Sequence, residues 1–154
     1  MVSEGDSVPK FAVNDANGNK IKSNDFKGKK HAIYFYPKDF TPGCTTEADE
    51  FSKDYKKFQK EGIEIIGVSP DDIDSHKKFC DKMEIKYTLF TDVDKEISNL
   101  FGVWGKEKFM GREYMGVMRS TFLVNEKGKI FKIYPKVKPA GHSKEVLKDF
   151  LNLK

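Results

Sequence analysis

The chain has 154 residues and a mass of 17.7 kDa, a length that predicts one domain with a real hydrophobic core. Hydrophobic residues make up 38% of the chain and aromatic residues 13%, which excludes a disordered or low-complexity protein. Its 28 basic and 24 acidic residues give a net charge of +4 and are interspersed, and only Arg112 and Arg119 are arginines, so nucleic acid is not an expected partner.

The first thirty residues predict a β-hairpin. Short apolar pieces at 11–13 and Ile21 flank Asn17-Gly18, and an Asn-Gly step is a strong turn signal. Residues 31–36 then form a nearly continuous apolar and aromatic run, which is typical of a strand buried on both faces. Pro37 ends this strand and begins a loop.

After this loop the apolar period changes from that of a strand to that of a helix. The pattern predicts a helix from about residue 44 to residue 60, which Gly62 ends. A second buried strand over 63–68 follows. Asp71 or Asp72 can then cap a helix whose apolar residues are Ile73, Phe79, Cys80 and Met83.

The rest of the chain continues to alternate strands and helices. We expect a strand over 87–90, a short helix over 97–101, and two strands over 120–124 and 130–134 joined by a hairpin turn, with an amphipathic helix at the C-terminus. A βαβα unit followed by a hairpin and a helix predicts an α/β fold with a central mixed sheet, helices on both faces and the N-terminal hairpin. This is a thioredoxin-like architecture.

Two cysteines are too few for a disulfide scaffold, so their surroundings decide their role. Cys44 stands between the loop that follows a buried strand and the start of a helix, where free N–H groups and the helix dipole stabilise an anion such as a thiolate. Pro42 and Gly43 allow a sharp turn into the helix, Thr41 supplies a hydroxyl, and Glu47 lies one turn later. The alternative is an inert cysteine buried at a helix start.

Other kinds of site have little support in the sequence. There is no Cys-x-x-Cys pair and no Gly-rich phosphate motif. His31, His76 and His142 are far apart, with no cysteine or carboxylate at ligand spacing, so no metal or other cofactor is expected. A Cys–His hydrolase would need one of these histidines beside Cys44, and nothing in the sequence supports that pairing.

The loop before the helix carries a resemblance to a known family. Pro37, Thr41 and Cys44 match the P-x-x-x-T-x-x-C motif of the peroxiredoxins, in the AhpC/TSA superfamily. The longer stretch 35–45 resembles the Q-type, or bacterioferritin-comigratory-protein, subgroup. Further matches in the same order cover nearly the whole chain, at residues 5–11, 102–105, 114–117, 119–123 and 137–142.

The resemblance implies an antioxidant enzyme, a thiol-dependent peroxidase that comprises all of 1–154 as one domain. It implies that Cys44 is the peroxidatic nucleophile, that Thr41 bonds the peroxide and the sulfur, and that Pro37 shields the pocket from water. Arg119 would stabilise the thiolate and the transition state, with Glu47 orienting it. These roles suit the chemistry, because attack on an O–O bond needs an ionised sulfur and donors for the oxygens. Without the resemblance, Arg119 is explained equally well as a surface residue.

The second cysteine has two interpretations. Asp49 occupies the position where many Q-type members have a resolving cysteine, whereas Cys80 matches the position used by other members, in the next helix. Cys80 also fits an apolar helix stripe, as a core residue. If it resolves, the two cysteines can lie beyond the roughly 7 Å between Cα atoms that a disulfide tolerates, so local unfolding would be part of the cycle.

The resemblance also implies the partners: hydrogen peroxide and organic hydroperoxides as substrates and a thioredoxin-like dithiol as reductant. It favours a monomer, with a weak dimer as the alternative. No stretch approaches the roughly 20 apolar residues of a membrane span, and the N-terminus lacks the pattern of a signal peptide, so we expect a cytoplasmic protein. Two other functions stay open: a one-cysteine peroxidase with Cys80 structural, and a redox-inert binding protein of the same fold.

Overall fold

Nine strands and four α-helices make up the computed structural model, which describes residues 1–153 and every side chain in that range except that of Phe109. In chain order these elements are β1 (Ala12–Asn14), β2 (Lys20–Lys22), β3 (Lys30–Phe35), α1 (Pro42–Lys60), β4 (Ile63–Ser69), α2 (Ile73–Met83), β5 (Thr88–Thr91), α3 (Glu96–Phe101), β6 (Trp104–Phe109), β7 (Arg112–Val117), β8 (Ser120–Val124), β9 (Ile130–Tyr134) and α4 (His142–Leu151). A single 3-10 turn, η1 (Ser23–Phe26), follows β2.

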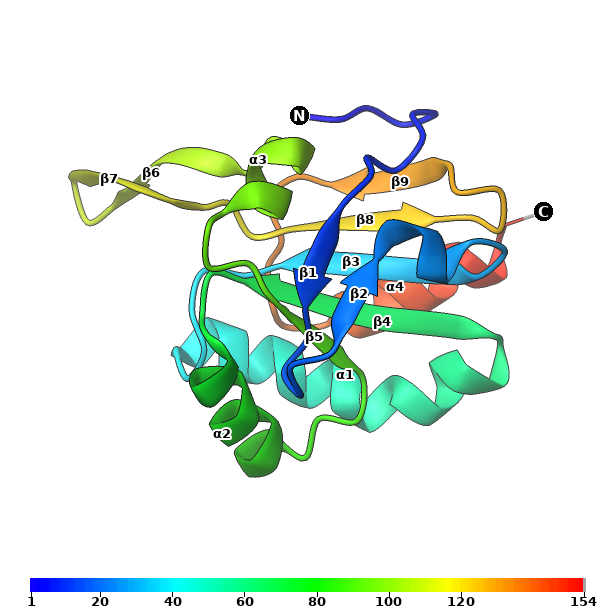
Figure 1. The fold of residues 1–154 in the computed structure, drawn as a ribbon, viewed down its shortest axis with the longest axis horizontal. Helices are drawn as coiled ribbons and strands as arrows, with labels where there is room; N and C mark the ends of the chain where they lie inside the picture. The colour runs from blue at the N-terminus through cyan, green and yellow to red at the C-terminus, as the bar shows by residue number, and fades with distance from the viewer. Residues whose placement is uncertain (154) are drawn as a thin grey trace.

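The central sheet has five strands in the order β5-β4-β3-β8-β9 (Figure 1). Strand β3 pairs in parallel with β4 and antiparallel with β8, so the sheet is mixed. The predicted N-terminal hairpin is present as β1 and β2, which pair antiparallel. The mixed α/β fold predicted from the sequence is therefore confirmed.

Alternation along β3 divides the interior into two cores. Ala32, Tyr34 and Tyr36 face the side that α1, α2 and α4 cover, whereas Ile33 and Phe35 face the side covered by α3 and the N-terminal hairpin. Successive strand residues point to opposite faces, and all five are at most 1% exposed. This burial on both faces explains why the segment is an almost uninterrupted apolar run.

Most of the predicted elements agree with the structure to within two residues. Helix α1 begins at Pro42, two residues before the predicted start, because proline fits the first helical position without loss of a hydrogen bond. Asp72, rather than Asp71, caps α2, and its side chain accepts a hydrogen bond from the Ser75 N–H at 2.9 Å. Strand β3 ends at Phe35, two residues before Pro37.

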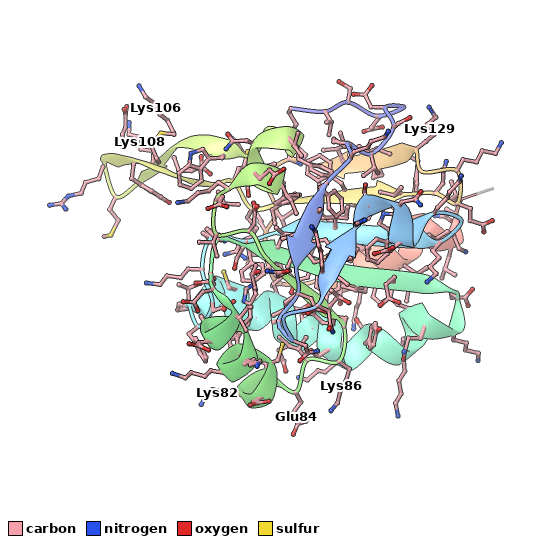
Figure 2. The ribbon with its side chains drawn as sticks, viewed as in Figure 1. Lys82, Glu84, Lys86, Lys106, Lys108 and Lys129 are labelled. Atoms are coloured by element: carbon pink, nitrogen blue, oxygen red, sulfur yellow. The ribbon has the colours of Figure 1, made fainter. Side chains whose placement is uncertain are left out.

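The hairpin formed by β6 and β7 was not predicted. It projects from the body of the molecule, with Lys106 and Lys108 extending from it (Figures 1 and 2). Its turn places Met110 at φ 51° and Gly111 at φ 80°, the two positive values of a type I′ turn. Of the part of the chain that the structure describes, no helix combines the length and the apolar character needed to cross a membrane.

Candidate active site

The site lies where β3 ends and α1 begins. Thr41 is the N-cap of α1, with extended backbone angles, and its side chain makes no capping hydrogen bond. The first intrahelical bond of this turn runs from Thr45 N–H to the Thr41 carbonyl at 2.8 Å. The N–H groups of Gly43 and Cys44 precede it and so have no intrahelical acceptor, which leaves two donors and the positive end of the helix dipole at the sulfur.

Cys44 is 1% exposed and lies beside a cation. Arg119 Nη2 donates a hydrogen bond to Cys44 Sγ at 3.3 Å, across 75 residues of sequence. Arg119 lies between β7 and β8 and is itself only 17% exposed at its side chain. A half-buried guanidinium therefore contacts the buried sulfur of Cys44 directly.

Glu47 holds the other side of the guanidinium. Arg119 Nη1 donates to Glu47 Oε1 at 2.7 Å, and the carboxylate is 1% exposed. Burial raises the pKa of Glu47 to about 7, although the charge of Arg119 opposes this rise. For Arg119, burial lowers the pKa, but Glu47 and Cys44 outweigh that effect and raise it overall.

A tight fit at Gly43 fixes the guanidinium against the helix. A β-carbon at Gly43 would lie 3.0 Å from Arg119 Nη2 and 3.4 Å from Pro139 Cγ. The backbone of the same arginine is held as well, because Val137 N–H donates to the Arg119 carbonyl at 2.9 Å. Glycine at position 43 therefore leaves room for the guanidinium, which a side chain there would crowd.

Two of the predicted residues lie next to this cluster without bonding the sulfur. The Thr41 hydroxyl donates to the Lys38 carbonyl at 2.9 Å rather than to Cys44. Pro37 is half-buried two residues after β3, in the loop that leads to Thr41. A cavity of about 530 Å³, lined by Arg119, Tyr114 and Lys106 among others, lies between the β6–β7 hairpin and the arginine.

Cys80 lies apart from this cluster, on α2. Both cysteines are free thiols. The Cys80 side chain is half-buried, packs against the helix-side core and borders a second cavity formed with the turn of the N-terminal hairpin and β5. Burial, together with the charges of Asp39, Asp81 and Asp15, raises the pKa of Cys80 to about 11.

A second buried cluster is not evident from the sequence. His76 Nδ1 lies 2.7 Å from Asp39 Oδ2, and ligand-type atoms of Asp39, Asp71 and His76 all lie within 4.8 Å of one another. Sequence spacing could not indicate this cluster, because Asp39 and His76 are 37 residues apart and meet only in the fold. Both nitrogens of His76 already face protein oxygens, Asp39 Oδ2 and the Phe90 carbonyl.

Comparison with known proteins gives consistent matches. The model of the AhpC/TSA family matches residues 4–133. Peroxiredoxin Bcp of Bacillus subtilis is 41% identical over 143 residues, covering 93% of this chain and 91% of the relative. Among solved structures, peroxiredoxin Q of Xanthomonas campestris has a TM-score of 0.87 at 36% identity, over 92% of this chain and 90% of that one. A mutant of PrxQ from Xylella fastidiosa has a TM-score of 0.93 at 29% identity, over 99% and 97%.

These matches cover nearly all of the chain and agree in sequence and in structure. The chain belongs to the AhpC/TSA family. It is a peroxiredoxin similar to the Bcp and Q proteins, and the thioredoxin-like fold predicted from its sequence is confirmed.

Proposed function

We propose that this peroxiredoxin, a thiol-dependent peroxidase, uses Cys44 as its peroxidatic nucleophile and Cys80 as its resolving thiol. The observation that carries the assignment of Cys44 is its contact with Arg119, because a 1% exposed sulfur at the start of a helix receives a hydrogen bond from a half-buried guanidinium. At Cys80, burial and acidic neighbours oppose ionisation of the sulfur.

In the first step the Cys44 thiolate attacks the nearer oxygen of a hydroperoxide. An S–O bond forms and the O–O bond breaks, so the sulfur is oxidised to a sulfenic acid. The leaving oxygen takes the O–O electron pair, and the proton that the Cys44 thiol released on ionising completes the water or alcohol. Arg119 and the N–H groups of Gly43 and Cys44 can donate to the oxygens as negative charge moves onto them. Glu47 orients the arginine, Pro37 limits the entry of water, and Thr41 bonds the bound peroxide after its hydroxyl leaves the Lys38 carbonyl.

In the second step Cys80 attacks the sulfenic acid. An S–S bond forms, the S–O bond breaks, and the hydroxide leaves with the proton of Cys80 as water. Cys80 must first leave the folded position of α2, where its pKa is raised to about 11 by burial. Local unfolding of α2 would both bring the sulfur to Cys44 and return its pKa to that of an exposed thiol.

A thioredoxin-like dithiol then reduces the disulfide by exchange and completes the cycle. The substrates are hydrogen peroxide and small organic hydroperoxides, and the reaction needs neither a metal nor an organic cofactor. We further propose that the whole chain acts as one domain, as a monomer in the cytoplasm.

Mass analysis before and after one equivalent of hydrogen peroxide tests this cycle. The reduced protein is oxidised, free thiols are trapped at once, and the peptides are mapped. We expect a loss of two hydrogens and a linked peptide containing both cysteines. Cys44→Ser should abolish the reaction, whereas Cys80→Ser should accumulate the sulfenic acid and then the sulfinic acid on Cys44.

Two other results would change the assignment. Oxygen gained on Cys44 alone in the wild-type chain would indicate a one-cysteine peroxidase. In that case Cys80 would have only a structural role, which its packing against the core also fits. No reaction at all would overturn both cysteine roles.

A further inference from the structure

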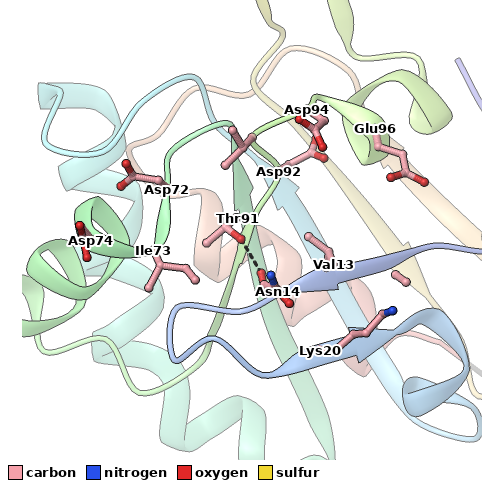
Figure 3. A pocket seen from close by; sticks show the side chains of 12 residues that line it. Val13, Asn14, Lys20, Asp72, Ile73, Asp74, Thr91, Asp92, Asp94 and Glu96 are labelled. Atoms are coloured by element: carbon pink, nitrogen blue, oxygen red, sulfur yellow. Dashed lines mark hydrogen bonds between the residues drawn. The ribbon is translucent and has the colours of Figure 1, made fainter.

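Few side chains attach α2, the helix that carries Cys80, to the rest of the molecule. His76 and Phe79 are its only fully buried residues. Its N-terminal turn borders an open cavity of about 550 Å³, with Asp72, Ile73 and Asp74 on that wall (Figure 3). A second cavity, of about 380 Å³, borders the part of α2 that contains Cys80. His76 and Phe79 therefore make the most deeply buried contacts of this helix.

His76 makes a hydrogen bond from each ring nitrogen. Nε2 lies 2.8 Å from the Phe90 carbonyl, which can only accept, so this nitrogen carries a proton. Nδ1 lies 2.7 Å from Asp39 Oδ2. Burial lowers the pKa of His76, but the hydrogen bond and charge of Asp39 outweigh it and raise the pKa above its ordinary value. The contact with Asp39 thus favours the charged form of this buried histidine.

Asp39 gathers donors from several parts of the chain. Its Oδ1 accepts from the Tyr36 hydroxyl at 2.7 Å, and its Oδ2 accepts from the Ser75 hydroxyl at 2.8 Å as well as from His76. Its backbone N–H donates to Asp71 Oδ2 at 2.8 Å, just before α2 begins. Asp39 is 3% exposed and lies in the loop that leads to Cys44. Asp39 therefore connects that loop to α2 by its side chain and to the segment just before α2 by its backbone.

The next residue of the loop is strained. Phe40 has φ 67°, a left-handed conformation that an aromatic residue rarely adopts and that persists only where the surroundings enforce it. Its side chain is 46% exposed and packs edge-on against Phe79 of α2, with ring centroids 5.1 Å apart. The strain is held by Asp39 on one side and by α2 on the other.

We propose that Asp39 and His76 form a latch, a buried ion pair that ties the loop before Cys44 to the helix that carries Cys80. Both are positioning residues for the reaction, and the inference rests on the two-cysteine cycle proposed above. With the latch closed, Cys44 stays beside Arg119 and Cys80 stays packed in α2. When it opens, Phe40 can relax, α2 loosens and Cys80 reaches the sulfenic acid.

The latch predicts opposite effects on the two halves of the cycle. Weakening it should speed disulfide formation and slow the attack on peroxide, because the closed form holds Cys44 in its reactive site. It should also protect Cys44 from overoxidation, since faster resolution leaves less sulfenic acid for a second peroxide. A residue with only a structural role would slow both steps together.

The kinetic test uses His76→Gln and Asp39→Asn, with Lys77→Gln and Asp74→Asn as matched controls at exposed positions of the same helix. Rapid quenching, thiol trapping and mass analysis give the rate of each step. Because a buried hydrogen bond to a charged group is lost, we expect resolution to accelerate roughly 10- to 100-fold in the latch variants. Overoxidation per turnover should fall in proportion. Both controls should stay within about twofold of the wild type.

Resolution that is unchanged or slower in folded latch variants would overturn the latch while leaving the two-cysteine cycle intact. The absence of any Cys44–Cys80 disulfide in the wild-type chain would instead overturn the proposed function. The two failures are therefore distinguishable.

A measurement on the wild-type chain keeps the test independent of variant folding. Nuclear magnetic resonance titration of the three histidines compares the reduced and disulfide forms. In the reduced form His76 should titrate above its ordinary range, whereas burial lowers the pKa of His31 and His142. In the disulfide form His76 should return toward its ordinary pKa of about 6.5. An unchanged His76 pKa in the two forms would mean that the latch stays closed, which contradicts the proposal.

The pKa of His76 is set by the charged groups that face its ring. Two charged side chains do so from outside α2, Asp39 in the loop and Asp71 in the segment before the helix. The neutral groups near the ring include the Tyr36 ring, just after β3, and the Phe90 carbonyl of β5. The Ser75 hydroxyl shares Asp39 Oδ2 with His76 Nδ1. Movement of α2 away from the loop would separate His76 from Asp39.

Discussion

Replacing Arg119 with alanine is the most direct test of the active-site geometry. The change removes the hydrogen bond from Nη2 to Cys44 Sγ, 3.3 Å long, and the bond from Nη1 to Glu47, 2.7 Å long. Arg119→Lys keeps the positive charge, but one ammonium group cannot reproduce the planar fork that contacts both partners. The pair of variants therefore separates charge from geometry.

The expected loss follows from the contacts. A hydrogen bond to a charged group contributes about 1.5–3 kcal/mol, and about 1.4 kcal/mol corresponds to a tenfold change in rate. Arg119→Ala should therefore slow the oxidation of Cys44 by roughly 10- to 150-fold. Glu47 should add little repulsion, since its pKa is already raised to about 7 with the arginine present, and without that cation the carboxyl will be neutral at pH 7. Arg119→Lys should fall between the alanine variant and the wild type.

The assay is competition for hydrogen peroxide against a peroxidase of known rate, in a Cys80→Ser background where only Cys44 reacts. Arg112→Ala is the matched control, because it removes the only other arginine from an exposed position on β7 and changes the net charge equally. We expect this control to react at the parental rate. If Arg119→Ala also reacts within threefold of the parent, the guanidinium does not activate the sulfur and the reasoning fails.

Three further predictions concern the packing and charge of the same site. Gly43→Ala should slow Cys44 oxidation about tenfold, by displacing Arg119, while the free energy of unfolding changes by less than about 1 kcal/mol; Gly105→Ala, which meets no atom within 4 Å, should change neither. The raised pKa of Glu47 means that its contribution to stability is present below about pH 4.5 and lost as the pH rises to about 7. Urea unfolding at pH 5 and pH 8 measures this loss. The free energy of unfolding of Glu47→Gln, relative to that of the wild type, should rise by up to about 3 kcal/mol between pH 5 and pH 8. An equal difference between the two proteins at both pH values would contradict the raised pKa of Glu47. Gly67→Ala should lower the free energy of unfolding by about 1–3 kcal/mol, because its β-carbon would lie 2.7 Å from Leu89 and 2.9 Å from Tyr34; an unchanged urea midpoint would show that these side chains yield freely.

The elements that could be predicted are those whose pattern is local. Residues 31–36 lie at the middle of the sheet with a core on each face, and burial on both faces requires a continuous apolar run in the sequence. The β6–β7 hairpin has no comparable apolar pattern. Most of the described side chains of β7 are exposed, so nothing selects an apolar alternation there, and the Met110-Gly111 turn is a weaker signal than Asn-Gly.

The site divides in the same way. Thr41, Cys44 and Glu47 stand close together in one segment, so the loop-to-helix junction could be inferred from neighbouring residues. Arg119 reaches that junction across 75 residues, and only the family resemblance singled it out. Physical patterns in sequence specify helices and strands, but they do not state which loops meet at the end of the sheet.

The ion pair between Asp39 and His76 is the clearest case of what local pattern cannot supply. Taken alone, Asp39 is an ordinary acidic loop residue, and His76 is an ordinary histidine on an amphipathic helix. Their pairing becomes meaningful only because both lie at most 3% exposed and because the two segments that they join carry the two cysteines. A peroxidase that resolves its own sulfenic acid needs a closed form in which one sulfur is activated and an open form in which the other arrives. Because a buried ion pair is costly to break on one side yet gains water when both partners are released, it is suited to separate two such forms cleanly.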